Sequence, residues 1–249
     1  DASGEIANVI VRVDTNAADT NGAQKITMGK GDDTVIFDML SDARAGLTIS
    51  DTVAGGDGTD QLVIDGNGVR VSLGASEWTN VTGFESVRTV GNGAAAISTR
   101  IGDNSYNLTL TNDLITANGG GMLIINNDND SSNDAATTLG QSAGANTAGT
   151  GAESAVTIDA RSLNAQNHFT YNGEEGGWND TVANGVFDAG DAFLAGTVDK
   201  IVFADANING KNVIDGGAVD NLSTTFAANT DILEVRNGAT VTTGDLAGI

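Results

Sequence analysis

Gly55-Gly56-Asp57-Gly58-Thr59-Asp60-Gln61-Leu62-Val63 is the stretch that decides the fold, because it joins a tight turn to the start of a strand. It fits the nonapeptide G-G-x-G-x-D-x-U-x, in which U is a large apolar residue, at every defined position. A second stretch, Met28-Gly29-Lys30-Gly31-Asp32-Asp33-Thr34-Val35-Ile36, fits all but the first glycine. Glycines allow positive φ and close packing in the turn. The two matches predict a repeated unit of turn and short strand.

The oxygen atoms of these turns are the ligands that a hard cation prefers. Calcium takes about six to eight oxygens, which backbone carbonyls and carboxylates can supply. We therefore expect calcium in these turns, and an ordinary Gly/Asp hairpin turn is the alternative interpretation. The candidate ligands are Gly29, Gly31, Asp33, Gly56, Asp57, Gly58 and Asp60.

The spacing of the two turns leaves their relative position open. Asp33 and Asp60 are 27 residues apart, whereas two nonapeptides, about 18 residues, separate stacked turns on one edge of a regular β-roll. The longer spacing predicts either an insertion between turns on one edge or turns on opposite edges. With this spacing, the two turns need not share one ion.

A second candidate cation site lies at 180–191. Its sequence is close to the calcium loop of an EF-hand, with acidic or amide side chains at loop positions 1, 5, 9 and 12 and glycine at position 6. Valine at position 3 and aspartate at position 12 depart from that pattern, and a solvated turn is the alternative. The candidate ligands are Asp180, Asn184, Val186, Asp188 and Asp191.

Short β-branched segments bounded by Gly, Asn or Asp recur along the chain, and helical periodicity is scarce. This pattern predicts an all-β protein with many short strands. The predicted strands are 6–13, 34–37, 62–64, 86–90, 108–111, 122–125, 156–158, 200–203, 213–214 and 232–235. Residues 126–151 have few large apolar side chains and predict a polar loop or linker. This segment separates two β-rich lobes, 1–125 and 152–249, or interrupts one continuous solenoid.

The composition excludes several classes of function. The 249-residue chain has 33 acidic and 11 basic residues and a formal net charge of −22, which argues against binding to nucleic acid or anionic lipid. It has no cysteine, so disulfide scaffolds, thiolate zinc sites and thiol nucleophiles are excluded. No apolar run is long enough to form a transmembrane segment. We expect no signal peptide in the first residues, which are typical of the middle of a longer protein.

The sequence offers little for catalysis. The one histidine, His168, lies in His168-Phe169-Thr170-Tyr171, and a lone histidine in such a segment is typical of a structural residue. No zinc-protease, serine-hydrolase or P-loop motif is found. Acidic pairs are frequent, but the aromatic residues that usually line carbohydrate clefts are few. We expect that the chain is not an enzyme.

The two glycine-rich turns, followed by Gly83-Phe84-Glu85-Ser86-Val87, resemble the RTX-type (haemolysin-type calcium-binding) repeat regions of bacterial surface-layer proteins and large secreted adhesins. The resemblance covers roughly residues 26–90, and later units at 156–163, 171–173 and 179–182 are less specific. It implies a parallel β-solenoid, or β-roll, that holds rows of calcium outside the cell, at the bacterial surface, after type I secretion. The chain departs from the family in two ways: it has only two good nonapeptides, and the spacers between its units are long and irregular.

One function is expected from these observations, with two alternatives. Uncompensated carboxylates repel one another, so calcium should be needed for compaction, and open solenoid ends favour stacking. We expect a calcium-dependent structural module that self-associates into an extracellular bacterial assembly, such as a surface-layer (S-layer) lattice or filament; a cell-surface glycan is a further candidate partner. A calcium-rigidified stalk or binding module of a type I-secreted adhesin is the alternative. A β-roll attached to a secreted hydrolase comes third.

Overall fold

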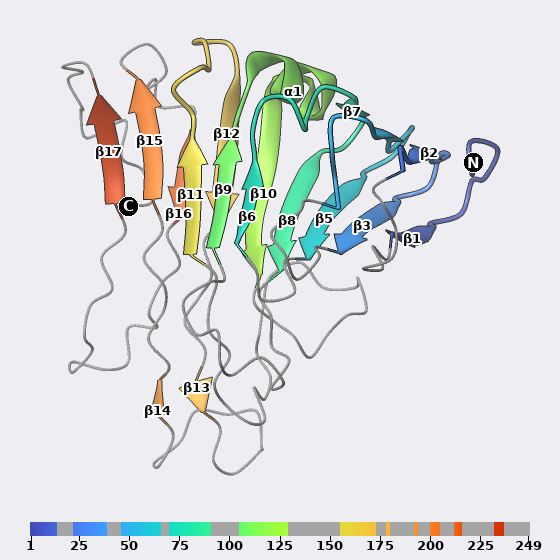
Figure 1. Ribbon diagram of the computed structural model, residues 1–249, viewed down its shortest axis with the longest axis horizontal. Coiled ribbons are helices and arrows are strands. Elements are labelled where there is room, and N and C mark those ends of the chain that lie inside the picture. The colour runs from blue at the N-terminus through green and yellow to red at the C-terminus, as the bar shows by residue number, and fades with distance from the viewer. Residues whose placement is uncertain are drawn as a thin grey trace.

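The computed structural model describes residues 1–13, 22–38, 46–65, 70–90, 105–128, 155–172, 178–179, 192–193, 200–204, 212–215 and 232–236. Within these residues the protein is mostly β-structure (Figure 1). Two short helical segments interrupt it, α1 (Asn112–Ala117) and the 3-10 turn η2 (Gly119–Gly121). The all-β class expected from the sequence is confirmed for this part of the chain.

Parallel strands form three sheets in the described structure. Sheet A has seven strands in the order β1 (Ile10–Val13), β3 (Thr34–Asp38), β5 (Gln61–Asp65), β8 (Ser86–Val90), β10 (Met122–Asp128), β12 (His168–Asn172) and β16 (Val213–Asp215). Sheet B contains β2 (Lys25–Thr27), β4 (Thr52–Ala54) and β7 (Val81–Thr82). Sheet C has five strands in the order β6 (Val71–Leu73), β9 (Ser105–Thr109), β11 (Ala155–Asp159), β15 (Lys200–Ala204) and β17 (Ile232–Arg236). An antiparallel pair joins β13 (Trp178–Asn179) to β14 (Ala192–Phe193).

The chain visits these sheets in turn and does not complete one sheet before starting the next. Neighbouring strands β3 and β5 of sheet A, for example, are separated along the chain by β4 of sheet B. Both predicted lobes contribute to the same sheets, because β10 pairs with β12 and β9 pairs with β11. β10 also extends to Asp128, into the segment predicted as a polar loop from residue 126.

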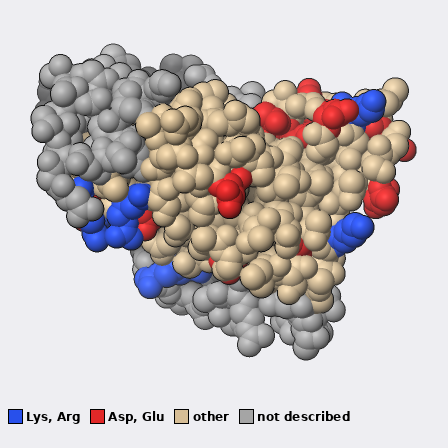
Figure 2. Space-filling model, turned by 90° about the horizontal axis from the view of Figure 1, so that it is seen from above, with Lys and Arg blue, Asp and Glu red and all other residues tan. Residues whose placement is uncertain are grey.

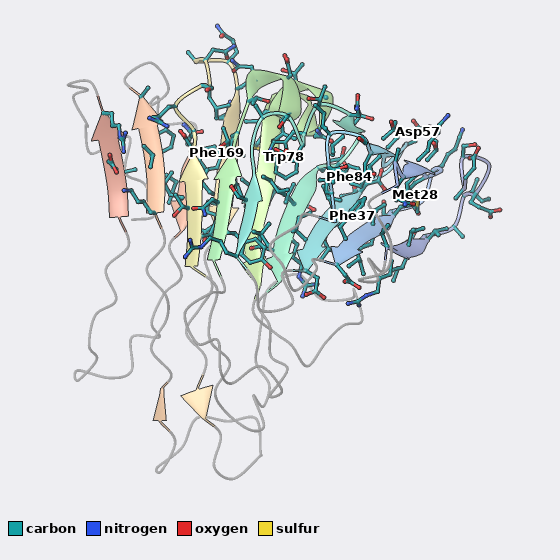
Figure 3. All side chains as sticks on the ribbon, in the orientation of Figure 1. Met28, Phe37, Asp57, Trp78, Phe84 and Phe169 are labelled. Carbon is teal, nitrogen blue, oxygen red and sulfur yellow. The ribbon has the colours of Figure 1, made fainter. Side chains whose placement is uncertain are left out.

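A continuous apolar core is built from residues of sheets A, B and C (Figure 3). One row of paired neighbours in sheet A shows how it is built, since every member is at most 2% exposed: Val35, Leu62, Val87, Ile125 and Tyr171. On β9 of sheet C, the Tyr106 hydroxyl donates to the Ile64 carbonyl oxygen of β5 at 3.2 Å. This hydrogen bond links the two sheets across the core.

Strands β3 and β5 are buried on both faces. Ile36 and Val63 alternate with the inward-facing residues, yet they are only 8% and 4% exposed. Strands covered on both sides favour continuous apolar runs over strict alternation. This explains why both strands are evident in the sequence as short, uninterrupted apolar segments.

Most connections that leave the C-terminal ends of sheet A strands are longer than those that lead back to sheet A. After the C-terminal ends of sheet A strands, 14 residues separate β8 from β9 and 26 separate β10 from β11. In contrast, eight residues separate β11 from β12, and eight separate β15 from β16. The strand starts of sheet A are therefore approached by short connections, and the candidate site lies among them.

Candidate functional site in the stacked glycine turns

The two nonapeptide-like turns, 28–33 and 55–60, stack directly on one edge of the structure. Thr34 pairs with Gln61 where β3 and β5 begin. The Asp57 N–H donates to the Gly29 carbonyl oxygen at 2.8 Å, which joins the turns backbone to backbone. The 27-residue spacing is thus one passage from β3 through β4 to β5. Of the two arrangements that the spacing left open, the structure has turns on the same edge.

Glycine is required where these turns touch. A methyl group on Gly56 would overlap the carbonyl oxygen of Gly29, and one on Gly58 would overlap that of Gly31. Gly56 and Gly58 also have φ angles of 113° and 143°, which residues with side chains rarely adopt. Close contact between neighbouring backbones therefore explains the glycines of both turns, whether or not an ion is bound.

Three acidic side chains, Asp33, Asp60 and Glu85, lie in register directly before β3, β5 and β8, and we call them the acidic column. Each accepts a hydrogen bond from the backbone N–H of the aligned residue directly before the neighbouring strand. The distances are 2.8 Å from Val9 to Asp33 Oδ1, 2.7 Å from Asp33 to Asp60 Oδ1 and 2.7 Å from Asp60 to Glu85 Oε2. Buried N–H groups need such partners, so the acidic column fixes the register of neighbouring strands.

The second carboxylate oxygen distinguishes the two motif aspartates. In Asp33, Oδ2 accepts a further hydrogen bond from the Gly29 N–H at 3.1 Å. In Asp60, Oδ2 is buried and has no hydrogen-bond partner among the described residues. Both residues are 1% exposed. Because a buried, unpaired anionic oxygen destabilises a protein, Asp60 is the position in the column that needs a proton or a cation.

The environment of Asp60 already favours its protonated form. Burial raises the pKa of Asp60 from 3.8 to about 6, and the neighbouring carboxylates of Asp33 and Glu85 act in the same direction. The hydrogen bond from the Asp33 N–H opposes this shift. A cation bound at Asp60 would favour the charged carboxylate instead.

The residues of the second turn fit calcium better than those of the first. Asp60 Oδ2 and the Gly83 carbonyl oxygen both face the same side of Gly55, whereas both oxygens of Asp33 already accept backbone hydrogen bonds. The Asp57 side chain is 80% exposed. Within the described ranges, no three acidic, histidine or cysteine side chains converge as a metal site. A cation here would therefore take most of its oxygens from the backbone and from water.

The second predicted cation site lies outside the described residues. Its candidate ligands Asp180, Asn184, Val186, Asp188 and Asp191 remain a prediction. His168, the one histidine of the chain, begins β12, and its Nδ1 lies 3.1 Å from the Gln166 carbonyl oxygen.

Four further capping residues were not evident as site residues in the sequence. Glu85 belongs to the acidic column, and Asp51 accepts a hydrogen bond from the Gln24 N–H at 2.7 Å. Asn118 and Asn212 accept hydrogen bonds from the N–H groups of Phe84 and Phe169, both at 3.0 Å. A polar residue directly before a short apolar strand was the available signal for three of them. Asn118 follows α1 and has no such signal.

Acidic side chains gather toward the N-terminal end of the described surface, on the right of Figure 2. Arg12 of β1 compensates two of the acids on sheet A. Its guanidinium contacts Asp38 at 2.8 Å and Asp65 at 2.9 Å, and so spans three neighbouring strands. Its side chain is 42% exposed, which limits the stabilisation that these ion pairs provide.

No family model, curated protein or solved structure matches the chain. In the described part of the chain, no helix has the length and apolar character needed to cross a bilayer. Since fold alone does not define function, function has to be argued from the acidic column and the stacked turns.

Proposed function

We propose that the protein is a structural module of an extracellular bacterial assembly, most consistent with a surface-layer lattice or filament, and that it has no catalytic role. In this proposal the three parallel sheets wind as a β-solenoid. The observation that carries the proposal is the stacking of glycine turns and acidic side chains in register along neighbouring strands. Such a repeated arrangement is suited to a rigid scaffold, in which each unit contacts its neighbours.

Calcium is the ion that we propose for these turns. The formal net charge of −22 opposes compaction, and the unpaired Oδ2 of Asp60 supplies a buried anionic ligand. Calcium that binds the folded state alone would stabilise it by about 2.7 kcal/mol per site at 100-fold excess over Kd. The acidic module would then be most stable where calcium is millimolar, outside the cell.

The edge strand β1 supports self-association. It lies at the end of sheet A in the described structure, and Ile10 on it is 56% exposed. Edge strands with apolar side chains are templates for pairing with another chain. A calcium-rigidified adhesin stalk remains the second candidate, because the same stack could serve as a monomeric spacer, and a cell-surface glycan is a candidate partner for either.

Calcium dependence is tested by thermal melting of the whole protein, followed by circular dichroism, in millimolar calcium and in EGTA. We expect a β-spectrum in both and a melting temperature higher by several degrees in calcium. An identical melting temperature in EGTA, together with no calcium in a metal analysis of the protein, would contradict the proposal.

Assembly is tested separately, by electron microscopy in calcium. Ordered sheets or fibres are expected for the structural module, and dispersed rods would favour the adhesin stalk. Ile10→Lys should reduce assembly because it places a charge on the edge strand. Ile49→Lys is the matched control, since Ile49 is 57% exposed but lies outside the described strands.

A further inference from the structure

The next turn along the chain, 83–85, is joined to the second nonapeptide turn by hydrogen bonds, although it does not match the nonapeptide. Glu85 Oε2 accepts the Asp60 N–H at 2.7 Å, and the Glu85 N–H donates to the Asp60 carbonyl oxygen at 3.1 Å. A methyl group on Gly55 would lie 2.7 Å from Asp60 Oδ2 and would overlap the Gly83 carbonyl oxygen. One oxygen from each turn, Asp60 Oδ2 and the Gly83 carbonyl oxygen, therefore lies on the same side of Gly55.

We propose that the cation site of this region lies between turn 55–60 and turn 83–85, and that Glu85 and the Gly83 carbonyl oxygen complete it. The proposal rests on the calcium binding proposed above. It adds two ligands that lie outside both nonapeptides, and it places the ion away from the contact between the two nonapeptide turns.

The hydrogen bonds of the first turn are the reason for this placement. Both carboxylate oxygens of Asp33 accept backbone N–H groups, and the Gly29 carbonyl oxygen accepts the Asp57 N–H. These groups already satisfy the contact between the nonapeptide turns. Asp60 Oδ2, which is buried and has no partner in the described structure, lies beside Gly55 on the side of Gly83.

The charge of Glu85 should matter more than its hydrogen bond. A glutamine at this position retains a carbonyl oxygen that can accept the Asp60 N–H, but it removes one negative charge from beside Asp60. Calcium affinity rises with the number of charged ligands. Glu85→Gln should therefore weaken calcium binding while the strand register is kept.

The test is calcium titration by calorimetry of the full chain, with thermal melting in EGTA measured in parallel. We expect Glu85→Gln to lower calcium affinity by at least about tenfold and to keep or raise the melting temperature in EGTA. Asp113→Asn, which removes the same charge from the exposed first turn of α1, should bind calcium within about twofold of the wild type. Glu85→Asp, which keeps the charge on a shorter side chain, should be intermediate.

The outcomes separate this proposal from the one it rests on. Wild-type affinity in a folded Glu85→Gln variant would overturn the role of Glu85 and leave calcium binding intact. Equal losses in Glu85→Gln and Asp113→Asn would overturn it too, because they would indicate a general charge effect. If the wild type itself binds no calcium, both proposals fail. If Glu85→Gln does not fold in EGTA, Glu85→Asp decides, and wild-type affinity there would count against a direct ligand.

Discussion

The side chains that cap backbone N–H groups near the strand starts of sheet A are carboxylates where they belong to residues 1–90, and amides where they belong to later residues. Asp33, Asp60 and Glu85 do this in the first region, and Asn118 and Asn212 do it in the second. The geometry of the hydrogen bond is similar, at 2.7–2.8 Å in the first region and 3.0 Å in the second. The two regions differ chiefly in charge.

This difference indicates that capping alone does not require an acid. A neutral amide oxygen accepts the N–H without repelling its neighbours, whereas adjacent carboxylates in register raise one another's energy. The three acids of the acidic column are therefore explained best by a second function in addition to capping, and we propose that this function is cation binding. The following predictions test the contrast between the acid-capped and the amide-capped region.

The largest effect is expected from the glycines. Gly56→Ala should lower the free energy of unfolding by about 3 kcal/mol or more, because the new methyl group would overlap the Gly29 carbonyl oxygen at a φ of 113°. Gly120→Ala in the later region should cost about 1 kcal/mol, since φ is 59° but no atom lies within 4 Å. Urea unfolding measures both, and equal losses would contradict stacking of the turns.

Replacing an amide cap by an acid should destabilise the protein in the later region. Asn118 Nδ2 donates to the carbonyl oxygens of Val81 at 3.0 Å and Leu114 at 2.8 Å. Asn118→Asp would replace this donor by an anionic oxygen in a site that is 2% exposed. We expect a loss of about 2–3 kcal/mol in urea unfolding at pH 7. Wild-type stability would show that the two kinds of cap are interchangeable.

The reverse replacement, of an acid by an amide, should have different effects on stability at Asp33 and at Asp60. In the wild type both carboxylate oxygens of Asp33 accept backbone N–H groups. Asp33→Asn would therefore place its NH₂ group against a backbone N–H and should lower the free energy of unfolding by about 2 kcal/mol. Asp60→Asn keeps the acceptor for the Asp33 N–H and should be neutral or stabilising without calcium. Unfolding in EGTA measures both, and equal losses would refute the distinction.

The pH dependence follows from the raised pKa of Asp60. This pKa is about 6 in the folded protein, against 3.8 for an aspartate that is fully exposed to water. The folded state therefore binds the proton of the Asp60 carboxyl group more tightly than the unfolded state does. The stabilisation that this protonation provides is complete below pH 3.8 and is lost as the pH rises through about 6. Without calcium, we expect the difference between wild type and Asp60→Asn to change by about 1 kcal/mol from about pH 5 to about pH 7. A constant difference would contradict the shift.

The smallest effect is expected at the surface. Arg12→Ala removes two ion pairs from a half-exposed side chain and should lower stability by about 0.5 kcal/mol, an effect that high salt should mask. Melting at low and high salt checks this. A loss that persists at high salt would indicate that packing of the Arg12 side chain is more important than its charge.

Much of the β-structure could be predicted because its strands carry a strong local signal. All ten predicted strands overlap strands of the structure. Strands β2, β4, β6, β7, β13 and β14 were not predicted, since two or three residues are too short for a periodic pattern. β12 is also absent from the predicted strands, although its apolar residues Phe169 and Tyr171 alternate with polar ones as in a half-buried strand.

The candidate site was predicted in its residues but not in its geometry. The nonapeptides identified Gly56, Gly58, Asp33 and Asp60, which the structure brings together on one edge. The two aspartates differ in their second oxygen, because Asp33 Oδ2 accepts the N–H of Gly29, four residues earlier, whereas Asp60 Oδ2 has no partner among the described residues. Both nonapeptides have a glycine four residues before the aspartate, so the pattern does not encode this difference. The participation of Glu85 depends on the register of β5 and β8, which the sequence does not show locally.

The unequal lengths of the connections have a consequence for how this protein can change. Segments that follow sheet A vary from five residues, between β5 and β6, to 26 between β10 and β11, while strand register persists on either side of them. Natural insertions can therefore accumulate at these places without disturbing the core. The same places are suited to the display of foreign peptides or epitope tags on an intact scaffold.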